Sequence, residues 1–203
     1  MDREDPQFVR ACALVVVLGV IAMGIATVAA DIVVPENDWI SDTISEMAAG
    51  QDTRWIADLG IYGLAVGIMF AALGCAHLHP GSTRWSIGTG LLGVAAFVVF
   101  MIGVRNEYGD GDNDGVSIHL YLVAALGLLM TAIPLLLSVA AGLVSHGHLV
   151  ALRVLGVLWA VTAPIFFIMP DGYDGAYERG LGVLAGVILL TIASLLRRGA
   201  GRI

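Results

Sequence analysis

The sequence predicts an all-α membrane protein, a polytopic bundle of six transmembrane helices that forms one integral membrane domain over residues 1–203. Hydrophobic residues make up 58% of the chain and charged residues only 13%, against about 25% charge in ordinary soluble domains. The apolar residues fall in separate blocks, and roughly 20 such residues are enough to cross a bilayer as a helix. The connections between these blocks leave no room for a separate soluble domain.

The first span is expected over residues 9–34, around an uncharged run from Ala11 to Ala30. A cleavable signal peptide is the alternative, because Val28-Ala29-Ala30 resembles a cleavage site. The net acidic N-terminus and the length of the apolar run favour a retained helix over a signal peptide.

Five further blocks complete the predicted bundle. Pro134 and Pro164 fall inside the fourth and fifth spans, where a proline kinks a helix and its neighbours supply partners for the freed carbonyls. The expected spans cover residues 55–76, 86–104, 118–143, 149–169 and 180–196.

The distribution of charge predicts the orientation. An even number of spans places both termini on one side, and that side carries seven of the ten arginines. The positive-inside rule therefore predicts a multi-pass cell-membrane protein with cytoplasmic N and C termini. Fourteen of the seventeen acidic residues fall in or near the opposite, extracytoplasmic loops, and this acidic face argues against a nucleic-acid partner.

Small residues recur at helical spacing in the second span, at Gly60, Gly63 and Gly67. A helix face without side chains allows close approach of a neighbouring helix, and packing is what drives helix association in lipid. Gly182 and Gly186 of the sixth span offer a similar pair and are a candidate partner. Cys12 and Cys75 lie within apolar runs and are expected to be small buried hydrophobes.

A polar segment separates the first two spans and carries the pattern Thr43-Ile-Ser-Glu46. This spacing fits a capping box, in which Thr43 accepts from the Glu46 backbone and the Glu46 side chain reaches back. We therefore expect a short outer-face helix between helices one and two. Capping alone would explain Glu46, whereas Ser45 has no part in that motif.

Asp58 follows about two turns into the second span. A carboxylate at that depth is costly unless it is paired or hydrated, which makes it a candidate functional residue. Two structural alternatives stay open. The helix N-terminus favours a carboxylate in the first turn, and Arg54, four residues earlier on the same helix, could satisfy Asp58 locally.

The other candidates lie at the predicted outer ends of the spans. His119 opens the fourth span, and the pair Glu178-Arg179 opens the sixth. We predict that these residues form one polar, ligand-binding cluster with Asp58 and Ser45 at the outer mouth of the bundle, with Glu46 capping it from the loop helix. No catalytic residue is assigned.

Asp110, Asp112 and Asp114 resemble the first ligand positions of an EF-hand loop. The position that should hold a bidentate glutamate is Tyr121, so a complete EF-hand is excluded. The three aspartates remain a candidate site for a divalent cation, and a solvated acidic turn is the alternative. No motif for another cofactor is present.

The segment ISDTISEMAAG, followed by the glycine-rich second span, resembles the "S-x-x-SELGA" region of a bacterial and archaeal membrane family, domain-of-unknown-function family nine-nine-eight. His119 and the run Tyr177–Gly180 also match its pattern. The chain departs from the family at Met47 and Ala48, where Leu and Gly are usual. The resemblance implies a six-helix membrane protein and leaves the biochemical role open.

Three functions fit these features. The first is a non-enzymatic protein whose acidic outer site binds a cation or a small polar or lipid headgroup. The second is an intramembrane metal-assisted hydrolase at the outer leaflet that uses Asp58, His119 and Glu46, although metal sites usually draw on more than one histidine. The third is a small ion-coupled transporter with Asp58 as the coupling carboxylate. We favour the first, with the lipid bilayer as the general partner and a homo-oligomer or a partner membrane protein left open.

Overall fold

The computed structural model is all-helical within the residues it describes, which are 5–34, 37–48, 54–104, 118–170 and 172–201. Six long helices, one short helix and one 3₁₀ segment follow one another along the chain. They are α1 (Pro6–Val33), α2 (Ile44–Ala48), α3 (Arg54–Leu78), α4 (Thr83–Val104), α5 (Ile118–Val144), α6 (His146–Thr162), η1 (Ala163–Ile168) and α7 (Asp174–Gly199).

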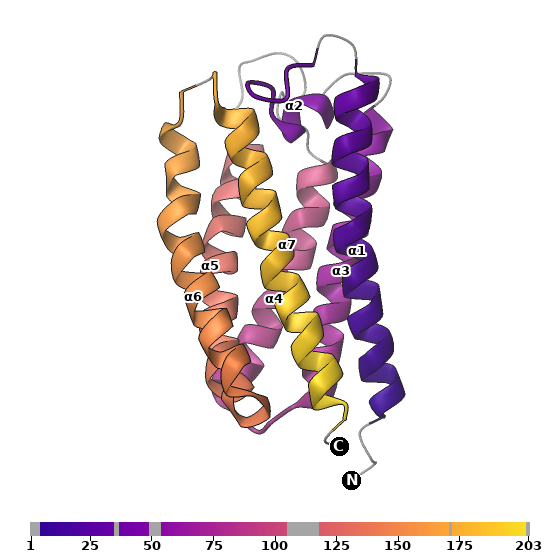
Figure 1. Cartoon of the computed structure of the whole chain (residues 1–203), viewed down its shortest axis with the longest axis vertical. Coiled ribbons are helices and arrows are strands. Elements are labelled where there is room, and N and C mark those ends of the chain that lie inside the picture. The colour runs from indigo at the N-terminus through magenta and orange to yellow at the C-terminus, as the bar shows by residue number, and fades with distance from the viewer. Residues whose placement is uncertain (1–4, 35–36, 49–53, 105–117, 171, 202–203) are drawn as a thin grey trace.

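The long helices pack as an up-and-down bundle in which sequence neighbours are neighbours in space (Figure 1). Each long helix contacts the next one in the chain, and α7 closes the ring by packing against both α6 and α1. Helix α2 lies at one end of the bundle and both termini lie at the other (Figure 1). We refer to these as the α2 end and the termini end.

Six segments are long and apolar enough to cross a membrane: five of the long helices, and α6 taken together with η1. The outer surface of the bundle is apolar as well. Large hydrophobic side chains stand exposed around it, including Ile25, Phe97, Leu128 and Val183. Such a surface would drive aggregation in water but suits contact with lipid tails. The structure therefore has the form of a multi-pass membrane protein.

The glycines of α3 pack against α1, and this is the closest helix pair in the bundle. A Cβ atom added to Gly67 would lie 3.3 Å from the Cα of Gly19, and one added to Gly19 would lie 2.6 Å from the carbonyl oxygen of Gly63. The suggestion that Gly182 and Gly186 of α7 form the partner surface is therefore wrong. Gly186 instead faces Val20 of α1, and a Cβ atom added at Gly182 would meet no other atom within 4 Å.

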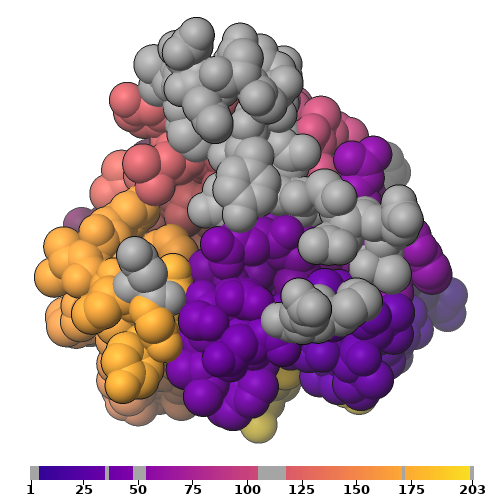
Figure 2. Space-filling model, turned by 90° about the horizontal axis from the view of Figure 1, so that it is seen from above, coloured from indigo at the N-terminus to yellow at the C-terminus, as the bar shows by residue number. Residues whose placement is uncertain are grey.

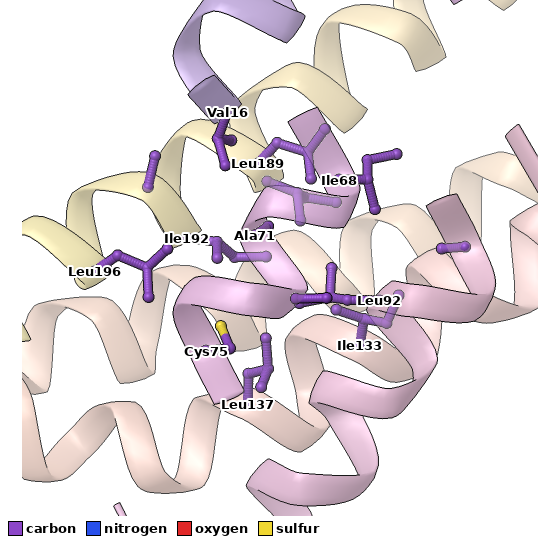
Figure 3. Packing of buried hydrophobic residues seen from close by; sticks show 14 of the residues in the cluster. Val16, Ile68, Ala71, Cys75, Leu92, Ile133, Leu137, Leu189, Ile192 and Leu196 are labelled. Atoms are coloured by element: carbon purple, nitrogen blue, oxygen red, sulfur yellow. The ribbon is translucent and has the colours of Figure 1, made fainter. Parts of the chain in front are cut away.

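The core lies where α3 meets the other helices. Figure 3 shows Ile68, Ala71 and Cys75 of α3 among buried side chains from α1, α4, α5 and α7. Cys12 and Cys75 are both free and buried, which confirms their expected role as small hydrophobes.

The two prolines have different effects on their helices. Pro134 lies within α5, which continues through it, whereas α6 ends and the 3₁₀ segment η1 begins at Ala163, next to Pro164.

Helix α7 begins at Asp174 rather than near Gly180. Glu178 and Arg179 therefore lie one turn inside α7, where their side chains can reach the segment around α2.

Candidate functional site

Helix α2 begins with the capping box that the sequence predicts. The Thr43 hydroxyl accepts a hydrogen bond from the Glu46 backbone N–H at 3.1 Å, and the Glu46 carboxylate accepts from the Thr43 backbone N–H at 2.7 Å. This reciprocal pairing satisfies donors that a helix N-terminus otherwise leaves open. Glu46 thus has a structural task at the start of α2.

A second carboxylate reaches the same turn from α7. Glu178 accepts from the Ile44 backbone N–H at 2.5 Å and from the Ser45 hydroxyl at 3.4 Å. A negative charge at a helix N-terminus is favourable, because the exposed N–H groups carry partial positive charge. Glu178 therefore anchors α2 to α7.

Ser45 also joins α2 to α5. Its Oγ atom lies 3.0 Å from Nε2 of His119, the second residue of α5. His119 is buried, with 7% of its surface exposed. Ser45 thus stands between an imidazole and a carboxylate that come from different helices. We call Ser45, His119 and Glu178 the polar roof, because Ser45 and Glu178 border the cavity described below and His119 lies beside Ser45.

Arg179, next to Glu178, holds a different set of groups. Its guanidinium forms an ion pair with Asp31 of α1 and donates to the Asp42 carbonyl at 2.7 Å and to the Gly175 carbonyl at 3.0 Å. Bidentate pairing of arginine with a carboxylate is a strong, directional interaction. One side chain therefore ties together the end of α1, the segment before α2 and the start of α7.

The segment before α2 lies directly on α7. A Cβ atom at Gly175 would overlap the Asp42 carbonyl oxygen, so only glycine fits there. The Ala176 backbone N–H also donates to the Ile40 carbonyl at 2.9 Å. Seen from the α2 end, this purple segment lies across the bundle beside the orange residues that lead into α7 (Figure 2).

A cavity of about 170 Å³ lies beneath the polar roof. Ser45 and Glu178 border it at the α2 end, and almost all other lining residues are apolar. An apolar cavity of about 150 Å³ is large enough to hold a benzene-sized molecule. The walls include Met23, Ile61, Leu64, Val99, Leu126, Gly127, Trp159, Phe166, Leu181, Gly182 and Ala185.

The lining of the cavity extends to the surface of the bundle at Gly182 of α7 and Phe167 of η1. Both residues line the cavity and both are exposed. A Cβ atom at Gly182 would meet no other atom within 4 Å. Gly182 therefore has room for a side chain at the edge of the cavity.

Asp58 stands apart from these hydrogen bonds. It is half-buried on α3 and interacts electrostatically with Arg54, one turn earlier on the same helix. None of the hydrogen bonds described above that join Ser45, His119, Glu178 and Arg179 to their neighbours involves Asp58. The structure brings Ser45, His119 and Glu178 together, places Arg179 and Glu46 next to them, and does not bond Asp58 to the group.

The candidate cation site at Asp110, Asp112 and Asp114 lies outside the described residues. Within the part of the chain that the structure describes, no three His, Cys, Asp or Glu side chains lie close enough together to hold a metal ion.

Sequence reasoning missed Asp31 and the cavity. Asp31 directly follows the uncharged run of α1. A carboxylate at the end of a span could therefore have been predicted to pair with Arg179. The cavity is lined by residues from seven helices and η1. No local pattern in the sequence predicts that these residues meet around one cavity.

A family model described as "Protein of unknown function (DUF998)" matches residues 12–195. The chain belongs to this family, as the resemblance of its ISDTISEMAAG segment indicates. Neither the curated proteins nor the solved structures give a match to this chain.

Proposed function

We propose that this protein binds a small amphipathic molecule, such as a lipid with a polar headgroup, in the cavity beneath the polar roof. The observation that carries this proposal is the cavity itself, which combines apolar walls with Ser45 and Glu178 at one end. Ligand pockets typically have this composition, with apolar walls and a few polar groups that fix orientation.

The polar roof would receive the headgroup. Glu178 already satisfies the start of α2, and Ser45 lies between Glu178 and His119. A hydroxyl or amine of the ligand could exchange hydrogen bonds with Ser45 and Glu178, which border the cavity, while the adjoining apolar part occupies the cavity and the rest of the chain extends toward the opening. The opening beside Gly182 and Phe167 faces the bilayer, so an amphipathic molecule could enter without passing through water.

The proposed setting is the cell membrane, with the polar roof on the extracytoplasmic side and both termini in the cytoplasm. The support for this orientation is the excess of arginines in the loops at the termini end. In this setting the ligand comes from the outer leaflet.

The test is native mass spectrometry of the protein purified in mild detergent, followed by analysis of the lipids that remain bound. We expect a stoichiometric amphipathic species on the wild type and its loss from Gly182→Leu, because leucine would fill the opening. Gly180→Leu is the matched control, since position 180 also has open space around it but does not line the cavity.

Equal retention of the same species by wild type, Gly182→Leu and Gly180→Leu would contradict the proposal. So would a wild-type protein that carries no bound amphipathic molecule and takes none up from added lipid.

A further inference from the structure

A groove of about 410 Å³ runs between α6 and α7 at the termini end of the bundle, where Figure 1 shows the two helices side by side. One wall comes from the start of α6 and the residue before it, and the other from the last turns of α7. The groove shares no lining residue with the cavity beneath the polar roof.

The lower part of this groove is polar and cationic. Arg198 is exposed in the last turn of α7, and Ser194 is exposed one turn before it. The Ser194 hydroxyl lies 3.2 Å from Nε2 of His148, whose side chain is buried against α7. The Ser145 hydroxyl, which also lines the groove, makes no capping hydrogen bond to α6.

The upper part of the groove is apolar. Val187 and Leu190 of α7 line it and are 42% and 39% exposed. Ala151 of α6 faces them across the groove. Polarity therefore changes along the groove from charged near the helix end to apolar toward the middle of the bundle, as it does along a phospholipid from headgroup to acyl chain.

We propose that this groove binds an anionic phospholipid, with the phosphate at Arg198 and Ser194 and an acyl chain along Val187 and Leu190. Arginine is well suited to phosphate, because its planar guanidinium donates two parallel hydrogen bonds. No carboxylate lines the groove, so its charge complements an anion. The site is independent of the cavity beneath the polar roof.

The experiment titrates the purified protein in neutral detergent with phosphatidylglycerol and, in parallel, with phosphatidylcholine and inorganic phosphate, and reads binding by native mass spectrometry. We expect phosphatidylglycerol to bind and Arg198→Gln to weaken that binding roughly tenfold, as for loss of a hydrogen bond to a charged group. Arg84→Gln is the control, because Arg84 is an exposed arginine at the same end of the bundle that lines neither groove nor cavity.

A second variant protects the test against misfolding of Arg198→Gln. Ala151→Leu narrows the groove without changing its charge and should also weaken phosphatidylglycerol binding, whereas Gly180→Leu, at a position that lines neither groove nor cavity, should leave it unchanged. Equal binding of phosphatidylcholine and phosphatidylglycerol, or displacement of the lipid by inorganic phosphate at equal concentration, would overturn the proposal. So would phosphatidylglycerol binding that neither Arg198→Gln nor Ala151→Leu weakens.

Discussion

Arg179 of α7 forms an ion pair with Asp31 of α1, although 148 positions separate the two residues in the chain. The pair is mostly buried, with 14% and 21% of the side chains exposed. Arg179 also donates to the Asp42 carbonyl, so one guanidinium contacts both α1 and the segment before α2. The arrangement explains why Glu178 and Arg179 occur together: one anchors the start of α2 and the other anchors the segment that leads into it.

Replacing Arg179 should loosen the α2 end. We expect Arg179→Gln to lower the free energy of unfolding by about 1–3 kcal/mol, the range for hydrogen bonds to charged groups. Amide hydrogen exchange should become faster at residues 44–48. Arg84→Gln, at an exposed position near the start of α4, is the control. A double-mutant cycle with Asp31→Asn should show non-additive effects, and strictly additive effects would contradict the pairing.

The glycine contact between α1 and α3 makes a separate prediction. Gly67→Leu should destabilise the bundle by about 1–3 kcal/mol or more, because overpacking forces the two backbones apart. Gly24→Leu and Gly90→Leu should be mild, since neither position has another atom within 4 Å of an added Cβ. Thermal unfolding in detergent measures the difference, and identical melting temperatures for Gly67→Leu and wild type would refute the packing account.

A substitution at Ser45 can distinguish an effect on stability from an effect on ligand binding. Ser45→Ala removes the hydroxyl that faces His119 and Glu178 but leaves the bond from Ile44 to Glu178 in place. We therefore expect a loss of only about 1 kcal/mol in stability together with clearly reduced retention of the bound amphipathic molecule. Ser86→Ala, which removes a hydroxyl near the start of α4, should affect neither. Full retention by Ser45→Ala would limit Ser45 to a structural role.

The orientation can be measured in whole cells. A C-terminal reporter should be active in the cytoplasm, and cysteines placed at Gly50 and Gly111 should react with an impermeant thiol reagent added outside. Cys12 and Cys75 are buried and should give little background. Labelling of Thr83→Cys instead, with Gly50 and Gly111 protected, would reverse the topology.

The helical architecture was predictable because length and hydropathy decide whether a segment can span a bilayer. The capping box at Thr43 and Glu46 was also readable, since both partners lie within one turn. The helix that packs against the α3 glycines could not be predicted. Gly19 of α1 and Gly186 of α7 both lie on faces of small residues, and only the packing order of the helices decides between them.

The candidate site was predictable in part for the same reason. Ser45, His119 and Glu178 are polar residues near predicted span ends on one side, so their proximity follows from topology. The sequence also proposed Asp58 for this cluster. The direction of the Asp58 side chain depends on the rotation of α3 about its axis, and the contact of Gly63 and Gly67 with α1 fixes that rotation. In the structure Asp58 has Arg54 as its electrostatic partner instead.

Photo-crosslinking can show whether an amphipathic molecule occupies the cavity. A lipid with a photoreactive group in its tail is added to the protein, and the labelled positions are mapped by mass spectrometry. If the cavity is occupied, we expect labelling at Leu126, Leu181 and Ala185, which line it, and loss of this labelling in Gly182→Leu. Labelling confined to Leu128 and Val183, which face the bilayer at 75% and 69% exposure, would contradict it.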